Sequence, residues 1–244
     1  MIVPPLISNV EIVWEHELVS RTLEYLGKYF SCVQFDKRGI GLSDRFDEVP
    51  TLSQRIGDIS AVMSAVGWKK ANFLGISEGG AMGQLFAADF PDRVESLVLL
   101  NSIVSPRYRQ RIPDYVQDGD PPLQKTKEIY DRFLQLVETW SEEPACMVDW
   151  MMPSQTGNGS FIRSNGRMQR MACSPRDFRR QVESVHTLDA GDAPERISSR
   201  TMVIHVKGDR VLPVAGGRLL AQVIPNATEQ RKNRYSVRSA MGSC

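Results

Sequence analysis

Histidine is scarce in this chain: three occur in 244 residues, and none follows His205. Cysteine is almost as rare, and the four cysteines stand singly, without the C-x-x-C pair that zinc and redox sites commonly use. No apolar stretch approaches the roughly 18 residues that a membrane-spanning helix needs. We therefore expect reduced thiols, no metal, no cofactor and no membrane segment.

The start of the chain also lacks the pattern of a secretory signal peptide. Residues 1–7 contain no basic residue, and two prolines interrupt their apolar run. The formal net charge of +1 gives no electrostatic reason to expect nucleic acid or an anionic membrane as a partner. These features favour a cytoplasmic protein.

Apolar runs and helical patterns alternate up to about residue 100. Strands are predicted over residues 31–36, 71–76, 94–100 and 201–206. Thr51-Leu-Ser-Gln54 is a capping box, and it opens a helix whose buried face would hold Ile56, Ile59, Met63 and Val66. A second helix is predicted over residues 81–90. This alternation predicts an α/β fold, a mostly parallel sheet flanked by helices.

Residues 103–196 contain no convincing strand. One amphipathic helix would bury Ile129, Phe133, Leu136 and Trp140, and another begins at Ser174 and would bury Phe178, Val182 and Val185. Residues 153–159 between them are expected to form a loop. We therefore predict a core of residues 1–102 and 197–230, a helical cap insertion over 103–196, and a poorly packed basic tail over 231–244.

Gly75-Ile-Ser-Glu-Gly79 is a G-x-S-x-G pentapeptide between a predicted strand and a predicted helix. In that context the pattern is typical of a nucleophile elbow, a sharp turn that exposes a reactive serine. The residues two before and two after Ser77 must be small, and Gly75 and Gly79 meet this need. The following helix points its first N–H groups at the site, which favours developing negative charge. The alternative is a glycine-rich turn whose serine is incidental.

Two further segments also contain motifs that follow predicted strands. Asp36-Lys-Arg-Gly-Ile-Gly-Leu-Ser43 fits D-x-R-G-x-G-x-S, and Gly208-Asp209 forms a turn after a late strand. With these motifs the chain resembles the α/β-hydrolase family over residues 3–100 and 197–229. Trp14-Glu-His16 adds a likeness to the hydrolase domains that bacteria often attach to class III adenylate cyclases. The resemblance implies hydrolysis of small acyl compounds, by a fold whose N- and C-terminal parts are incomplete here.

The resemblance also implies roles for individual residues. Ser77 matches the nucleophile and Asp209 the acid of the triad, although a turn aspartate without a catalytic role is the alternative for Asp209. The backbone N–H groups of Glu78 and Leu6 match the two oxyanion donors. Leu6 follows Pro4-Pro5, which stands where the family has a His-Gly pair, and neither proline has an N–H to donate. The expected partner is a small acyl substrate or ligand.

The family's catalytic histidine follows the acid, and this chain has none there. His205 lies inside a predicted strand, His16 is expected at the surface, and His186 is a remote possibility for the base. In subtilisin, loss of the triad histidine costs about 10⁶-fold in kcat. Three hypotheses remain: an impaired serine hydrolase, a non-catalytic ligand-binding or signalling module, and a truncated or altered gene product.

Overall fold

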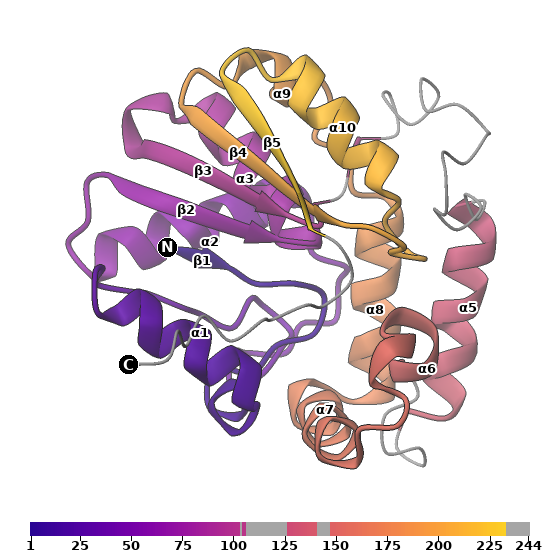
Figure 1. The fold of residues 1–244 in the computed structure, drawn as a ribbon. Helices are drawn as coiled ribbons and strands as arrows, with labels where there is room; N and C mark the ends of the chain where they lie inside the picture. Colours follow the sequence, from indigo (N-terminus) through magenta and orange to yellow (C-terminus); the bar gives the residue numbers. More distant parts are fainter. Residues whose placement is uncertain (103, 106–125, 141–146, 233–244) are drawn as a thin grey trace, which may run out of the picture.

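The computed structural model describes residues 1–102, 104–105, 126–140 and 147–232. Within them, five parallel strands form one sheet and lie side by side in the order in which they occur along the chain (Figure 1). They are β1 (Ile2–Val3), β2 (Ala71–Ile76), β3 (Val94–Leu100), β4 (Arg200–Val206) and β5 (Ala227–Lys232). The expected α/β fold with a mostly parallel sheet is therefore confirmed.

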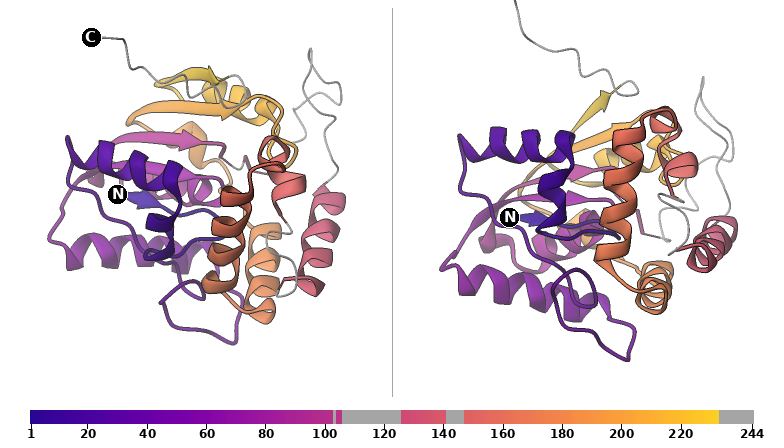
Figure 2. Two further views of the ribbon diagram at one scale, coloured as in Figure 1. Left: turned by 60° about the horizontal axis from the view of Figure 1, so that its bottom comes forward. Right: turned by 90° about the horizontal axis from the view of Figure 1, so that it is seen from below.

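Helices cover both faces of this sheet. One layer contains α2 (Leu52–Ala65), α3 (Glu78–Asp89), α9 (Ala193–Arg196) and α10 (Val214–Val223). On the opposite side of β1 lies α1 (Glu17–Gly27), which follows a short 3-10 helix, η1 (Ile12–Glu15) (Figure 2). A second 3-10 turn, η2 (Pro91–Arg93), leads from α3 into β3. Across the described ranges, no helix has the length and apolar character that a membrane span requires.

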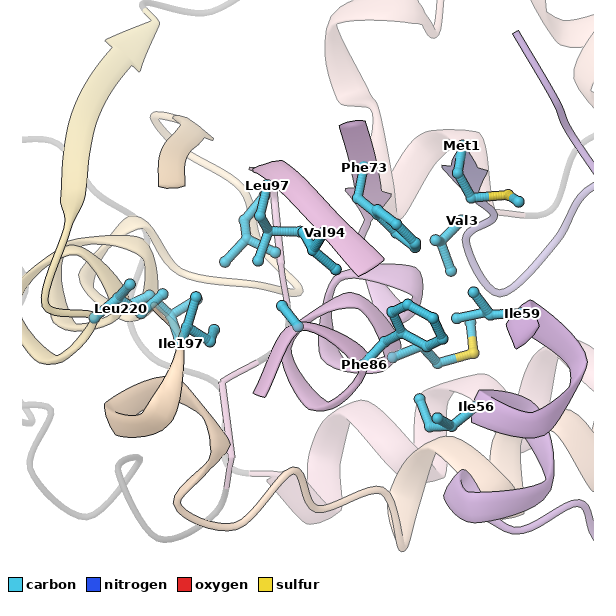
Figure 3. Packing of buried hydrophobic residues seen from close by; sticks show 14 of the residues in the cluster. Met1, Val3, Ile56, Ile59, Phe73, Phe86, Val94, Leu97, Ile197 and Leu220 are labelled. Carbon is cyan, nitrogen blue, oxygen red and sulfur yellow. The ribbon is translucent and has the colours of Figure 1, made fainter. Parts of the chain in front are cut away.

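The main hydrophobic core fills the space between the sheet and the layer that contains α2 and α3 (Figure 3). Phe73 of β2 and Phe86 of α3 stack there, with ring centroids 5.0 Å apart. Ile59 of α2 and Leu97 of β3 are fully buried beside them. This packing holds α3 against β2, and the turn that joins these two elements contains Ser77.

Between β3 and β4, the described residues form helices and no strand. They are α5 (Thr126–Glu138), α6 (Val148–Met151), the 3-10 turn η3 (Pro153–Gln155), α7 (Gly159–Ala172) and α8 (Pro175–His186), followed by the short α9 directly before β4. We call residues 126–140 and 147–186 the helical insertion. Its own core is aromatic: Trp140 stacks on Phe178 with centroids 3.8 Å apart, and Phe133 meets Trp150 edge-on at 4.9 Å. Leu6 and Ile40 belong to this second cluster and join it to the sheet domain.

Several predicted elements have the predicted bounds. The strands over residues 71–76 and 94–100 are confirmed, and β4 begins one residue before its predicted start. The capping box of α2 is also present, with Gln54 N–H donating to Thr51 Oγ1 at 3.2 Å and Thr51 N–H donating to Gln54 Oε1 at 2.8 Å. The helix predicted from residue 81 begins at Glu78, because the turn that enters it needs only Ser77.

Other predictions were wrong. Residues 31–36 form an isolated bridge from Gln34 to Ile2 and not a strand. The neighbouring β1 is only two residues long, since Pro4 and Pro5 have no N–H with which to extend a ladder. Val66 lies after the last residue of α2 and is 42% exposed, so it is not on the buried face.

Several elements were not predicted, among them α1, α7 and β5. Strand β5 reads Ala-Thr-Glu-Gln-Arg-Lys, and its lack of apolar alternation gave no strand signal. It pairs Arg231 with His205 and Lys232 with Val206, so the sheet extends two residues beyond the expected boundary of the basic tail. The rest of that tail, residues 233–244, lies outside the described residues.

Gly57 offers a direct test of α2. It is exposed in the helix interior, and a Cβ added there would meet no atom within 4 Å. Gly57→Ala should therefore raise the free energy of unfolding by about 0.5–1 kcal/mol, because alanine loses less backbone entropy in a helix. Gly67→Ala is the matched control: space is also open there, but φ is +73°, so the same change should destabilise. Urea unfolding measures both, and stabilisation by Gly67→Ala would contradict the assigned backbone.

Gly79 tests the packing of α3 against β1. A Cβ at this position would lie 2.3 Å from the Val3 carbonyl oxygen and 2.6 Å from that of Pro4. Gly79→Ala should therefore force the backbone apart and cost about 1–3 kcal/mol in the free energy of unfolding. Gly83→Ala, one turn later in α3, would place its Cβ 3.3 Å from the flexible Leu97 Cδ1 and should cost less. Equal losses in the two variants, measured by denaturant unfolding, would contradict the close approach.

Candidate active site

Ser77 lies at the sharp turn between β2 and α3, as the sequence predicted. Its backbone has φ 53° and ψ −116°, a conformation that L-residues rarely adopt. The turn is held by Ser77 N–H, which donates to the Leu100 carbonyl at 2.9 Å, and by Gly80 N–H, which donates to the Ser77 carbonyl at 3.0 Å. A Cβ at Gly75 would lie 2.8 Å from the Gly79 carbonyl oxygen. The glycines on both sides of Ser77 are therefore required by the turn.

A cavity of about 410 Å³ opens at this turn. Ser77 and Asp209 both line it. The other lining residues come from the strand ends, the N-terminal segment and the helical insertion; they are Pro5, Leu6, Ile76, Glu78, Leu100, Asn101, Val104, Ile129, Tyr130, Phe133, Met151, Met152, Val182, Val185, His186, Leu188, Val211 and Leu212. Most are apolar, and neither Lys nor Arg is among them.

Asp209 follows β4 and is held by three hydrogen bonds. Its Oδ1 accepts the N–H groups of Val211 and Leu212, each at 2.9 Å. Its Oδ2 accepts Nδ2–H of Asn101 at 2.7 Å. Asn101, at the end of β3, also accepts Val206 N–H at 3.1 Å, so one side chain ties the carboxylate to two neighbouring strands. The carboxylate is thereby fixed in orientation, as a residue that must position a partner needs to be.

Leu6 and Glu78, the two expected oxyanion donors, line the same cavity as Ser77. Glu78 is the first residue of α3, so its backbone N–H belongs to the end of the helix where negative charge is stabilised. Its side chain is not in contact with solvent. The carboxylate instead forms ion pairs with Lys37 and Arg55 inside the protein.

Lys37, Glu78 and Arg55 form a buried ion triplet. Each side chain is 1% exposed, which is rare for charged groups unless they are paired. Burial, assisted by the neighbouring Arg55 cation, lowers the pKa of Lys37 well below its ordinary value. Burial also lowers the pKa of Arg55 to about 10. Two basic side chains thus meet one carboxylate directly beside the turn that contains Ser77.

The structure brings one of the three histidines to the cavity. His186, at the end of α8, lines it with an exposed side chain and packs on Tyr130 of α5 at a centroid distance of 4.3 Å. His205 is buried, and its Nε2–H donates to the Leu212 carbonyl at 2.7 Å, which is a structural contact. His16 meets Phe161 edge-on at 4.8 Å and is not a lining residue.

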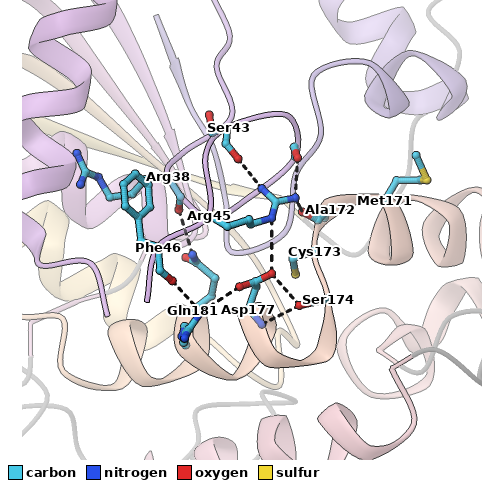
Figure 4. A network of polar contacts seen from close by, with 12 residues as sticks. Arg38, Ser43, Arg45, Phe46, Met171, Ala172, Cys173, Ser174, Asp177 and Gln181 are labelled. Atoms are coloured by element: carbon cyan, nitrogen blue, oxygen red, sulfur yellow. Dashed lines mark hydrogen bonds and ion pairs between the residues drawn. The ribbon is translucent and has the colours of Figure 1, made fainter. Parts of the chain in front are cut away.

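The helical insertion is fastened to the sheet domain at the end of α7 (Figure 4). The Ala172 carbonyl accepts Gly41 N–H at 2.7 Å, and the Met171 carbonyl accepts Asn9 Nδ2–H at 3.1 Å. Arg45 pairs with Asp177 of α8 at 3.6 Å. These contacts hold the end of α7 and the start of α8 against Asn9 and the loop that contains Gly41 and Arg45.

Sequence reasoning missed several residues of the site. Asn101 could have been found, because a polar residue directly after a buried strand lies at the same sheet edge as Asp209. The buried roles of Lys37 and Arg55 had only a weak signal, namely Arg55 beside the apolar face of α2. Methionine suits a pliable pocket wall as well as a core, and core packing is the expectation for Met151 and Met152 from sequence alone, whereas the structure places both at the cavity.

Two free cysteines lie in the described residues, and neither lines the cavity: Cys32 is exposed and Cys173 is buried. Cys173 is buried, and burial raises the pKa of its thiol to about 12, so it stays protonated at neutral pH. Within the same ranges, no three His, Cys, Asp or Glu side chains lie close enough together to hold a metal ion.

The chain is similar to known proteins in sequence and in fold. RutD of Caulobacter sp. strain K31, which carries the name of a carbamate hydrolase, is 26% identical over 215 residues, 84% of this chain and 73% of that protein. An esterase of Exiguobacterium antarcticum superposes with a TM-score of 0.75 at 16% identity, covering 96% of this chain and 82% of the other. The enol-lactonase of Burkholderia xenovorans LB400 gives a TM-score of 0.73 at 21% identity, covering 95% and 81%. The family model described as alpha/beta hydrolase fold matches residues 14–235, and the chain therefore belongs to the α/β-hydrolase fold family.

Proposed function

We propose that this chain is a serine hydrolase of small, uncharged acyl compounds. The observation that carries the proposal is a mostly apolar cavity of about 410 Å³ lined by both Ser77 and Asp209. A carboxylate substrate would find the Asp209 carboxylate in this cavity and no described lysine or arginine in its wall. An ester, lactone or carbamate with a short apolar chain matches such a surface.

In the proposed reaction, Ser77 Oγ attacks the carbonyl carbon while its proton passes to a base. The carbonyl oxygen becomes an oxyanion that the N–H groups of Glu78 and Leu6 stabilise. Asp209 orients the base, and the helical insertion acts as a cap that selects the acyl chain. The relatives support a neutral acyl carbonyl as the common feature, since their names refer to a carbamate, an ester and a lactone.

The proposed reaction needs a base to accept the Ser77 proton, and the expected base is missing. No histidine follows Asp209, and a carboxylate is too weak a base at neutral pH to activate a serine hydroxyl. We propose that hydrolysis is therefore impaired. His186 is the one histidine at the cavity wall, and it remains a candidate for a base supplied from the insertion and not from the chain position that the family uses.

A second candidate function is ligand binding without turnover. The favouring observation is that the cavity keeps its walls and its oriented carboxylate while no histidine occupies the family position. A ligand-binding or signalling module of this kind would bind the same small acyl compounds. Cytoplasmic location and the likeness to domains beside class III adenylate cyclases stay predictions.

Turnover of p-nitrophenyl acetate and butyrate separates these functions. The chain should hydrolyse both esters slowly, and a fluorophosphonate should label Ser77 slowly, because the serine lacks a base at the expected position. Initial rates and intact-mass labelling should be compared in the wild type, Ser77→Ala and His186→Ala. His16→Ala is the matched control, since it removes a histidine that does not line the cavity.

Each outcome assigns the site differently. Rapid turnover that is lost in both Ser77→Ala and His186→Ala would contradict the impaired site and identify His186 as the base. Rapid turnover that is lost only in Ser77→Ala would require a base other than histidine. Slow turnover that none of the three changes affects, together with saturable ester binding, would favour the binding module.

A further inference from the structure

The residue after Ser77 is held by its side chain as well as by its backbone. Glu78 is fully buried, and its two carboxylate oxygens pair with different cations, Oε2 with Lys37 and Oε1 with Arg55. Lys37 belongs to the loop before α2, and Arg55 belongs to α2 itself. The carboxylate is thus gripped by two separate segments, and it can rotate only if both ion pairs break.

These two ion pairs restrain the Ser77–Glu78 peptide, which the proposed reaction needs. The Ser77–Glu78 peptide carries one of the two proposed oxyanion donors, and Ser77 holds a left-handed φ of 53°. A strained backbone keeps its conformation only when its surroundings determine it. A fixed Glu78 side chain supplies such a constraint immediately next to the donor N–H.

Arg55 also connects Glu78 to the helical insertion through hydrogen bonds. Arg55 Nη2–H donates to Gln181 Oε1 of α8 at 2.8 Å, and Gln181 Nε2–H donates to the Arg38 carbonyl at 3.1 Å. Figure 4 shows Gln181 pointing from α8 into this loop. Gly39 makes the approach possible: a Cβ there would lie 2.8 Å from Gln181 Nε2. Gln181 is 1% exposed, so this contact is a buried link between the insertion and the elbow.

We propose that Lys37 and Arg55 are positioning residues that set the oxyanion donor of Glu78, and that Gln181 couples this setting to the docking of α8. The cavity wall and the elbow then respond together, because α8 also contributes Val182, Val185 and His186 to the cavity. An acyl compound that displaces α8 on binding would shift Gln181 and Arg55, and thereby the orientation of the Glu78 N–H. This inference rests on the proposed function, since it assigns a purpose to the Glu78 N–H.

Gln181→Leu tests the link. The change keeps the volume but removes both hydrogen bonds, and labelling of Ser77 by a fluorophosphonate should slow by about tenfold or more, because small displacements of catalytic groups have large kinetic effects. In that labelling, Ser77 Oγ bonds to phosphorus, fluoride leaves, and the serine proton passes to water. The dissociation constant of hexan-1-ol, an unreactive probe of the apolar cavity, should stay within about twofold of the wild-type value, since this ligand needs no oxyanion donor.

Ser184→Ala is the matched control. Ser184 is also buried on α8, and its Oγ–H donates to the Pro50 carbonyl at 2.7 Å, so the change removes a contact of α8 with the sheet domain without touching Arg55. Labelling should change by less than about twofold in this variant, because it shares no partner with the triplet. Equal slowing in both variants, or no slowing in Gln181→Leu, overturns the proposal. If Gln181→Leu does not fold, Arg55→Lys replaces it, because it keeps the charge beside Glu78 but loses the bond to Gln181.

A readout that is independent of reactivity separates this inference from the proposed function. If the wild type is not labelled at Ser77, the proposed function fails, and the Glu78 amide signal in a ¹⁵N spectrum decides the inference alone. That signal should shift in Gln181→Leu and stay in place in Ser184→Ala. An unmoved Glu78 amide in Gln181→Leu would show that α8 and the elbow are uncoupled.

Discussion

The buried triplet of Lys37, Glu78 and Arg55 is the interaction on which the rest of the site depends. Removing each charge from water costs several kcal/mol, and the mutual attraction offsets this only when geometry and hydrogen bonding are good. Apolar side chains of similar volume would stabilise the fold at least as well. The ion pairs instead fix the relative positions of three segments. Lys37 in the loop after Asp36 and Arg55 in α2 both bind the carboxylate of Glu78, the first residue of α3. The strained turn at Ser77 lies directly beside that residue.

The sequence predicted those features whose geometry depends on residues close together in the chain. The elbow was readable because Gly75 and Gly79 flank Ser77 between a six-residue apolar strand and a helix, and the structure shows backbone atoms where their side chains would be. The Thr51 capping box was readable for the same reason. The link from Arg55 to Gln181 was not, because it joins residues 126 positions apart. Strand β5 was missed because its polar residues pair through backbone groups at the sheet edge.

The histidines show how chain order and spatial order differ. A search by order places His186 before the acid and therefore rejects it, yet α8 runs along the cavity and brings its last residue to the wall. His205 lies closer to Asp209 in sequence, but the strand turns its ring inward to the Leu212 carbonyl. The number of residues between a histidine and Asp209 therefore does not indicate whether that histidine reaches the cavity. The direction in which each element presents its side chains decides which imidazole meets the cavity.

The described site contains groups that stabilise negative charge, and no histidine of the printed sequence follows Asp209. The helix terminus at Glu78 and its N–H groups favour an anion near Ser77 Oγ. Since electrostatic preorganisation does not depend on proton transfer, such a site still favours tetrahedral, oxyanion-like adducts over planar esters. On the proposed assignment, affinity for such adducts and the rate of turnover are therefore separable properties, because only turnover needs a base.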